Sequence, residues 1–408
     1  MSSPIFPDRK EEDPLRVESA ELVVGIPSLN EADSIQHPTT IADQGLKRFF
    51  PDKKGVIINC DNASPDNTRE AFLGVPTETP KIYLSTPEGV LGKGNNLFNL
   101  FQRVLELGAK GAVVVDADVE SITPKWIGNL AAPLFDGYDF VAPVYVRHRY
   151  EWTIANNIIY PLTRSLYGRR VREPMGGDFA VSAKLAERLL GEPRDDHTKG
   201  FGINTWITTL AVVSDMPFCQ TFLGGPRVHK VKENPADVLP LFSDNCAVLF
   251  SLAEKYYDYW KDIKWSKPIP IFGFDEEAVA GPRETQIHSA AHFEEFKKGL
   301  ARFQSVWKQI LHRDVYWKLQ EISGSPMENF EFPHLLWALT LYDYAVAFKR
   351  KTLPPERCME SLLPLYSGRV CSVAHATAHM DLREMEVYIE DQCRVFEETK
   401  QWLKQLWR

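Results

Sequence analysis

Several features that would assign this chain to a common class are scarce or absent. Cysteine is rare, with six residues among 408, and no two cysteines form a CxxC pair. A disulfide framework and a structural zinc site are therefore not expected, and the thiols should be reduced. No run of about 18 uninterrupted apolar residues occurs, and the polar N-terminus lacks the apolar core of a signal peptide. We expect a cytoplasmic protein without a membrane span.

Basic charge is not in excess either. Lys and Arg number 47 against 55 Asp and Glu, which gives a net charge of −8. A nucleic-acid partner is therefore not expected for the chain as a whole. The GxxxxGK[ST] spacing of a P-loop and the HExxH spacing of zinc hydrolases are both absent. Hydrophobic residues make up 44% and charged residues 25%, which is ordinary globular usage and allows a large core.

The first part of the chain alternates short apolar runs with helical patterns. Valine-rich or apolar runs lie at residues 21–26, 55–60, 81–84 and 111–115, and an apolar helical stripe covers residues 95–107. Apolar runs without alternation are typical of strands buried on both faces of a parallel sheet. Alternation of strands and helices predicts an α/β sandwich, with ligands at the carboxyl ends of the strands.

The second part of the chain is long and helical in pattern. Apolar stripes at helical spacing cover residues 292–319, 332–348 and 383–407. Aromatic residues on such stripes are usually part of the core, so we expect burial here. The tryptophans concerned are Trp307, Trp317 and Trp337.

Two carboxylates follow the clearest of the predicted strands. Asp116 and Asp118 come directly after the valines at residues 113–115. Oxygen ligands suit Mg²⁺ or Mn²⁺, and such an ion would bridge a diphosphate and stabilise a leaving group. His229 follows a later apolar segment and offers an imidazole as a further ligand. Two solvated aspartates and a structural histidine are the alternative interpretation.

Two glycine-rich turns could bring the backbone close to a ligand. Gly92, Lys93 and Gly94 precede a predicted helix, where free backbone N–H groups and the lysine charge would favour a phosphate. Gly177 and Asp178 form a second turn, in which the carboxylate could accept hydrogen bonds from sugar hydroxyls. Both segments are also compatible with ordinary turns.

Arginines gather between residues 147 and 172, where few acidic residues lie nearby. Because a guanidinium group binds carboxylate and phosphate as a fork, such a cluster suggests an anionic acceptor. A solvated helix face is the alternative. The cluster consists of Arg147, Arg149, Arg164, Arg169, Arg170 and Arg172.

Taken in chain order, these motifs resemble those of nucleotide-sugar-dependent glycosyltransferases with the GT-A fold. The ordered set comprises Pro27-Ser28-Leu29-Asn30-Glu31, Asp61 with the turn after it, Gly92-Lys93-Gly94, Asp116-Ala117-Asp118, Gly176-Gly177-Asp178 and His229. The nearest resemblance is to the mannosylglycerate synthase and glucosyl-3-phosphoglycerate synthase families. It is good over about residues 20–260 and loose beyond them.

The resemblance implies a Rossmann-like nucleotide-sugar-binding domain followed by an all-helical C-terminal region. We therefore expect an arm at residues 1–20, a GT-A catalytic domain at 21–270 and a helical domain at 271–408. The implied activity is a metal-dependent, retaining transfer of mannose or glucose to glycerate or 3-phosphoglycerate, the chemistry of compatible-solute synthesis. GDP-mannose, UDP-glucose and GDP-glucose are the candidate donors, and a homo-oligomer formed through the helical C-terminus is expected.

The resemblance also implies roles for individual residues. The expected nucleotide-sugar contacts are Pro27, Leu29, Glu31, Asp61, Lys93, Asp116 and Gly177. The expected ligands of Mg²⁺ or Mn²⁺ are Asp118 and His229. The expected catalytic residues are Asp118, Asp178 and Asn204, and the acceptor candidates are Arg147, Thr153 and Asn204. The family has an acidic residue where Asn204 stands, so this contact is expected to differ.

The stereochemical outcome and the reaction class leave alternatives. The Glu-Asp pair of inverting relatives is not visible at Asn204 and Thr205, which favours retention, although Asp178 could act as a general base. The rival functions are an inverting family-2 transferase acting on a polyprenyl phosphate or polysaccharide, a nucleotidyltransferase, and a non-catalytic scaffold.

Overall fold

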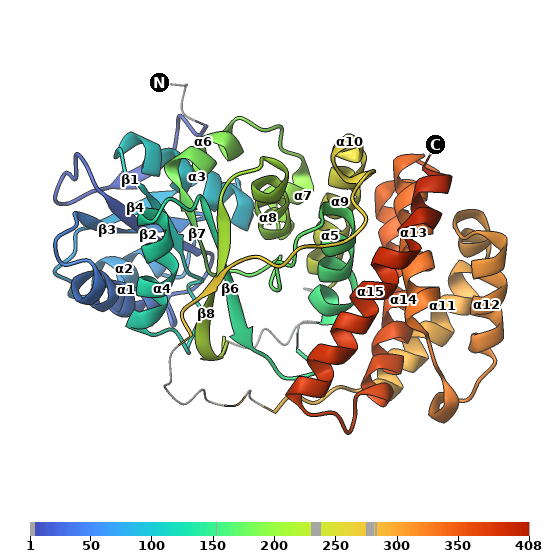
Figure 1. The fold of residues 1–408 in the computed structure, drawn as a ribbon. Coiled ribbons are helices and arrows are strands. Elements are labelled where there is room, and N and C mark those ends of the chain that lie inside the picture. Colours follow the sequence, from blue (N-terminus) through green and yellow to red (C-terminus); the bar gives the residue numbers. More distant parts are fainter. Residues whose placement is uncertain (1–4, 152, 230–237, 275–280, 282–283, 408) are drawn as a thin grey trace. The chain divides into compact units, whose positions relative to one another are not determined.

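The computed structural model describes residues 5–151, 153–229, 238–274, 281 and 284–407. The chain forms two compact units, here called the sheet unit and the helical unit (Figure 1). The sheet unit comprises Met1–Arg147, Arg172–Glu233 and Ile269–Arg283; the helical unit comprises His148–Val171, Asn234–Pro268 and Glu284–Arg408.

These units do not follow the expected division at residues 20 and 270. Residues 148–171 and 234–268 belong with the C-terminal helices, because the helices within them pack there. The expected N-terminal arm also takes part in the fold, since β1 (Lys10–Glu12) pairs antiparallel with β4 (Lys81–Ser85).

The sheet unit is built on one mixed sheet, whose order within the described residues is β1-β4-β3-β2-β5-β7-β6-β8-β9. The four predicted strands are confirmed as β2, β3, β4 and β5, and they pair in parallel. The parallel arrangement ends there, because β7 runs antiparallel to both β5 and β6. The remaining bounds are β2 Leu22–Ser28, β3 Gly55–Asp61, β5 Gly111–Val114, β6 Phe140–Val146, β7 Phe179–Ser182, β8 Phe218–Pro226 and β9 Ile271–Phe272.

Helices cover both faces of this sheet, which confirms the α/β fold class. Val24 and Ile26 join Leu46 and Ile127 in one apolar core on the face covered by α1 and α4. Gly25 points to the other face, where an added Cβ would lie 2.2 Å from Leu100 of α3. The helices of this unit are α1 Gln36–Phe49, α2 Thr68–Leu73, α3 Lys93–Glu106, α4 Pro124–Phe135, α6 Ala183–Leu190, α7 Asp196–Lys199 and α8 Ile203–Val213.

The helical unit confirms the predicted helical C-terminal region. Its elements are the π-helix η1 Ala155–Ile159, α5 Tyr160–Tyr167, α9 Val238–Lys255, α10 Tyr257–Trp260, α11 Ser289–Ile310, α12 Arg313–Ser323, the 3-10 helix η3 Met327–Asn329, α13 His334–Lys349, α14 Pro355–Ala376 and α15 Leu382–Leu406. None of the helices in the described ranges is long and apolar enough to span a membrane.

The predicted helix at residues 292–319 is two helices, α11 and α12. The backbone of Leu311 is extended, and the ring of His312 caps α12 by accepting from Asp314 N. The His312 amide donates to Asp343 Oδ2 at 2.7 Å, which fixes the break. This break also explains why the expected burial of Trp317 is wrong, since its side chain on α12 is 64% exposed.

The other tryptophans and the cysteines agree with expectation. Trp307 and Trp337 are fully buried, and their indole N–H groups donate to backbone carbonyls at 2.9 and 2.7 Å. All six cysteines are buried and free, so no disulfide forms, as predicted.

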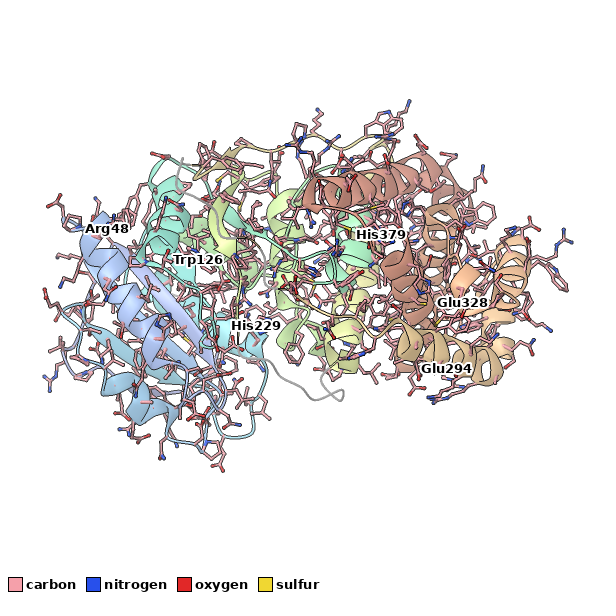
Figure 2. The ribbon with its side chains drawn as sticks, turned by 90° about the horizontal axis from the view of Figure 1, so that it is seen from below. Arg48, Trp126, His229, Glu294, Glu328 and His379 are labelled. Atoms are coloured by element: carbon pink, nitrogen blue, oxygen red, sulfur yellow. The ribbon has the colours of Figure 1, made fainter. Side chains whose placement is uncertain are left out.

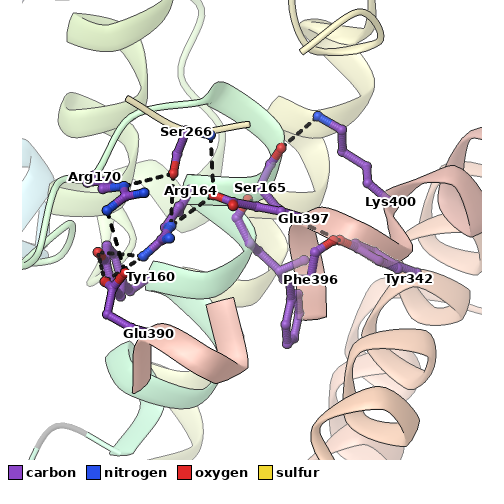
Figure 3. A network of polar contacts seen from close by, with 11 residues as sticks. Tyr160, Arg164, Ser165, Arg170, Ser266, Tyr342, Glu390, Phe396, Glu397 and Lys400 are labelled. Carbon is purple, nitrogen blue, oxygen red and sulfur yellow. Dashed lines mark hydrogen bonds and ion pairs between the residues drawn. The ribbon is translucent and has the colours of Figure 1, made fainter. Parts of the chain in front are cut away.

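A buried polar network joins α5 to α15 within the helical unit (Figure 3). Arg164 Nε donates to Glu397 Oε1 at 2.9 Å, and its Nη1 donates to Glu390 Oε1 at 2.5 Å. Lys400 Nζ donates to the Ser165 carbonyl at 2.7 Å. Removing one partner of such a buried pair leaves an uncompensated charge, so the network fixes how these two helices pack.

Candidate active site

The carboxyl ends of β2, β3 and β5 meet at one edge of the sheet. β2 lies between β3 and β5 and is parallel to both, with Ser28 in register with Asp61. The segments after these strands, which carry Glu31, Asp116 and Asp118, therefore start from the same edge. In open α/β sheets this edge is where ligands bind.

Asp116 is held between two cations at this edge. Its Oδ2 accepts from Arg227 Nη2 at 2.6 Å, and its Oδ1 accepts from Lys93 Nζ. Burial opposes ionisation of Asp116, but the charges of Lys93, Arg227 and His229 outweigh that effect. They hold the pKa of this carboxyl well below its usual range, so Asp116 is an anion at neutral pH.

Asp178 lies behind Asp116 and has no exposed surface. Its Oδ1 accepts from the Asp116 backbone N–H at 3.0 Å. Its Oδ2 accepts from Arg227 Nε at 2.6 Å and from the Tyr145 hydroxyl at 2.5 Å. Both oxygens are thus engaged with protein donors, which differs from the expected contact between Asp178 and a sugar.

Arg227 is the residue at this edge that the sequence interpretation missed. Its side chain is only 4% exposed and bridges Asp116 and Asp178 with two different guanidinium nitrogens. Although burial disfavours the charge, the two carboxylates raise the pKa of Arg227 well above its usual value. The sequence offered one signal for Arg227, its position two residues before His229. In an extended segment, side chains two residues apart point to the same side, so Arg227 could be expected near the site that His229 reaches.

His229 is brought to the carboxylate pair by backbone pairing (His229 is labelled in Figure 2). An isolated antiparallel bridge joins Val119 and His229, and Glu120 N donates to the Val228 carbonyl at 2.8 Å. His229 is exposed and Asp118 is half-buried, so both can be reached from solvent. The structure therefore brings the two predicted metal ligands to adjoining segments.

The donor set at this point suits a hard divalent ion only in part. Within the described residues no group of three or more His, Cys, Asp and Glu side chains is arranged to hold a metal. Mg²⁺ commonly takes one or two protein ligands and completes its coordination with water and substrate phosphates. Asp118 and His229 fit that pattern, in which the ion binds together with a diphosphate.

Glycines allow the close packing of this site. A Cβ on Gly177 would lie 2.1 Å from Asp116 Oδ2, so no other residue leaves that carboxylate in place. Gly92 has φ +111°, and an added Cβ would lie 2.3 Å from the Lys199 carbonyl. Gly94 is equally close to the Thr198 carbonyl, at 2.0 Å. The turn that contains Lys93 therefore packs directly against the backbone of residues 198–200.

The predicted nucleoside contacts differ in accessibility. Leu29 is 40% exposed, whereas Pro27 is buried within β2. Glu31 is buried and accepts from Ser34 Oγ at 2.6 Å. Asp61 accepts from Ser28 Oγ at 2.7 Å, from Ser64 N at 2.6 Å and from the Tyr83 hydroxyl at 3.0 Å. Asp61 thus orders the turn after β3 in this conformation, where contact with the base was expected.

The predicted acceptor residues fall in different units. Arg147 in the sheet unit forms a two-pronged pair with Glu173, with its Nε and Nη2 at 2.8 and 3.2 Å from the carboxylate oxygens. Thr153 belongs to the helical unit, where its hydroxyl lies 2.5 Å from that of Tyr366. Asn204 donates to the Met175 carbonyl at 3.4 Å, and its buried Oδ1 has no partner among the described residues.

The arginine cluster at residues 147–172 is also divided between the units. Arg147 and Arg172 lie in the sheet unit and the other four in the helical unit. Arg164 is buried and paired with two glutamates, and Arg170 lies 3.6 Å from Glu390. The cluster therefore does not form one free basic surface, because several of its charges are matched inside the protein.

Comparisons with known proteins give a likeness of fold. No protein-family model matches the chain, and no curated protein matches its sequence. Among solved structures, glucosyl-3-phosphoglycerate synthase from Mycobacterium tuberculosis, in complex with Mn²⁺, UDP-glucose and phosphoglyceric acid, is 21% identical with a TM-score of 0.44. The match covers 58% of this chain and 79% of that one.

Two further structures give similar values. The complex of the same synthase with Mg²⁺ and UDP is 21% identical over 58% of this chain and 79% of its own, with a TM-score of 0.44. A mycobacterial protein is 22% identical over 58% of this chain and 74% of its own, also with a TM-score of 0.44.

Proposed function

We propose that the chain is a metal-dependent glycosyltransferase that moves a hexose from a nucleotide diphosphate sugar to a small anionic acceptor of the glycerate type. The observation that carries the proposal is the charge arrangement after β5. There, Asp116 is fixed by Lys93 and Arg227 while Asp118 and His229 stand accessible on adjoining segments. Paired carboxylates at a strand end, beside a lysine on a helix N-terminus, suit a metal-bound diphosphate.

In this proposal the donor is bound along the carboxyl edge of the sheet. Asp118 and His229 would hold Mg²⁺ or Mn²⁺, which when bound supplies electrostatic stabilisation of the departing diphosphate. Lys93 carries charge toward the phosphates, and Asp116 and Glu31 are assigned to the ribose. Exposed Leu29 is assigned to the base, with Pro27 and Asp61 shaping its surroundings. Because Gly177 has no side chain, the carboxylate of Asp116 can occupy the space next to it.

The proposal assigns Asp178 to positioning, because both of its oxygens are engaged by Asp116 N, Arg227 and Tyr145. Asn204 cannot act as a carboxylate base. Neither residue therefore supplies the general base that inversion requires, which supports retention, with the leaving phosphate taking the acceptor proton. Inversion at the anomeric carbon in an NMR time course of the product would contradict this part.

The donor sugar, the nucleotide base and the acceptor are proposed only as chemical classes. The reaction should be assayed with UDP-glucose, GDP-glucose and GDP-mannose against D-glycerate and 3-phosphoglycerate, with Mg²⁺ or Mn²⁺. We expect product in at least one combination and none when EDTA is present. Nucleotide transfer to a sugar phosphate in the same assay would favour the nucleotidyltransferase alternative. A cytoplasmic location and a homo-oligomer through the helical unit remain parts of the proposal.

A matched pair of variants tests the site. Asp118→Ala should lower the rate of hexose transfer by at least about 1,000-fold, because it removes a proposed ligand of the metal ion that would stabilise the leaving diphosphate. Asp52→Ala removes an exposed aspartate from a turn of the same unit and should leave activity unchanged. Full activity in Asp118→Ala would refute the metal assignment.

A further inference from the structure

A small cavity lies inside the helical unit, bordered by the start of η1 and by α14 and α15. Its volume is about 10 Å³, room for about one water-sized group. The lining residues include apolar Val370, Val373 and Ile389 and polar Thr153 and Asn156, and the polar ones are here called the polar wall. None of the described residues that line it is acidic.

Arg149 is the charged residue that lines this cavity. Its Nη1 donates to the Met380 carbonyl, and its guanidinium lies 5.4 Å from the ring centre of Tyr150. Its Nε is buried and has no hydrogen-bond partner among the described residues. Arg147 and Arg164 form ion pairs with carboxylates, whereas Arg149 forms none with a described residue. A buried N–H without an acceptor costs about 1–3 kcal/mol, so an acceptor from a ligand would be favoured here.

A second arginine adds positive charge behind the cavity wall. Arg369 is 1% exposed and donates from Nη2 to Gln392 Oε1 at 2.7 Å and to the Tyr388 hydroxyl at 3.3 Å. Its Nη1 donates to the Phe332 carbonyl. These partners are neutral, and Gln392 and Tyr388 also line the cavity. A buried cation without a counter-ion is costly, and a bound anion nearby would reduce that cost.

The polar wall is held in place by hydrogen bonds to the π-helix. Gln392 Nε2 donates to the Asn156 carbonyl at 2.7 Å, which links α15 to η1. Single π-helical turns are often found at functional sites, because they shift side chains out of the regular helical order. The cavity thus combines an unsatisfied donor, uncompensated positive charge and a fixed polar wall.

We propose that this cavity takes up one oxygen of the carboxylate group of a small organic anion, with Arg149 Nε donating to that oxygen. Because the volume is that of about one water, the second carboxylate oxygen and the rest of the ligand would lie outside the cavity. Arg369 acts through Gln392 and Tyr388 as a positioning residue. The choice of D-glycerate as the test ligand rests on the proposed function.

Isothermal titration calorimetry tests the proposal by measuring the binding of D-glycerate to the full chain in the absence of any donor. We expect the wild type to bind, and Arg149→Gln to lower affinity about tenfold or more, as expected for one charge-assisted hydrogen bond. Arg302→Gln is the matched control, since Arg302 is 65% exposed on α11 of the same unit. Arg149→Lys, which keeps the charge, should retain part of the affinity.

Two further measurements separate the possible outcomes. UDP-glucose binding with Mn²⁺ should be the same in Arg149→Gln as in the wild type, which would show that the variant is folded. Inorganic phosphate should compete only weakly with D-glycerate, because a tetrahedral anion enters so narrow a space less easily than the flat edge of a carboxylate. Absence of D-glycerate binding, equal binding by Arg149→Gln, or strong displacement by phosphate would each overturn the carboxylate site. Failure of the transferase proposal would show itself differently, as D-glycerate binding without any product from the donors.

Discussion

Two buried arginines, Arg227 in the sheet unit and Arg164 in the helical unit, have nearly the same chemistry. Their side chains are 4% and 3% exposed, and each is paired with two carboxylates. They differ in where those carboxylates stand. The partners of Arg164 lie on α15 and join it to α5, whereas Arg227 orders a carboxylate at the sheet edge to which the proposal assigns the donor.

This difference shows that burial and charge pairing alone do not identify a functional residue. Asp116 keeps 20% of its side chain exposed and contacts Lys93, which is 19% exposed. A ligand at the sheet edge can therefore meet this network, and the segment that supplies Arg227 also supplies His229. The Arg164 network holds helices together, and nothing in its geometry requires a ligand.

Replacing each arginine by methionine should give the largest effects and separate the two roles. Arg227→Met removes the cation paired with buried Asp178, and Arg164→Met removes the one paired with buried Glu397, so each should lower the free energy of unfolding by about 3–5 kcal/mol. Transfer activity per folded molecule should fall about 100-fold in Arg227→Met because Asp116 moves, and should stay near the wild-type value in Arg164→Met. Urea unfolding and single-turnover transfer measure the two quantities. Equal activity in both variants would remove the distinction.

Gly177→Ala should have a smaller effect that is again confined to the sheet edge. The new Cβ would lie 2.1 Å from Asp116 Oδ2, so the carboxylate must shift at a cost of about 1–3 kcal/mol. Gly191→Ala is the control, because its nearest contact at 3.6 Å is ordinary and its φ is −77°. We expect nucleotide-sugar affinity to fall in Gly177→Ala only. Unchanged affinity there would mean that Asp116 does not touch the donor.

The pH dependence of stability should differ between the units in sign. The pKa of Asp116 is depressed, so its contribution is complete above about pH 4, its ordinary range, and is lost as the pH falls further. Burial raises the pKa of Asp343 in the helical unit to about 6, because its described hydrogen-bond donors, Trp402 Nε1 and His312 N, are neutral. Asp343 therefore costs stability as the pH rises from about 4 to about 6.

Asn substitutions check this prediction by urea unfolding at several pH values. Asp343→Asn should remove its loss of stability between about pH 4 and 6, and Asp116→Asn should reduce the acid loss below about pH 4, to which other carboxyls such as Asp66 also contribute. Identical pH profiles of stability for Asp343→Asn and the wild type would show that burial does not raise the pKa of Asp343.

Much of the sheet unit could be predicted because its signals are local. Runs of valine at residues 111–115 and 21–26 specify buried strands whatever packs on them, and the polar residues after each run mark the ligand edge. The strand β7 could not be predicted as an antiparallel insertion, because its four residues carry no pattern that sets direction.

The parts that could not be predicted depend on partners distant in sequence. The sequence indicates Asp178 as a polar residue after two glycines, but its saturation by Tyr145 and Arg227 requires residues 33 and 49 positions away. The arginine cluster suggested a free basic surface, because Glu390 and Glu397, which neutralise Arg164, lie more than 220 residues further along the chain. The break at Leu311 likewise depends on Asp343.

Binding of Mn²⁺ in the presence of a nucleotide sugar tests the central claim most directly. Electron paramagnetic resonance of free Mn²⁺, titrated with the protein and UDP-glucose or GDP-mannose, reports the bound fraction. We predict that the wild type and Asp52→Ala bind Mn²⁺ with at least one of these donors, and that Asp118→Ala and His229→Ala lose most of that binding. Binding that is equal in Asp118→Ala and in the wild type would contradict the account.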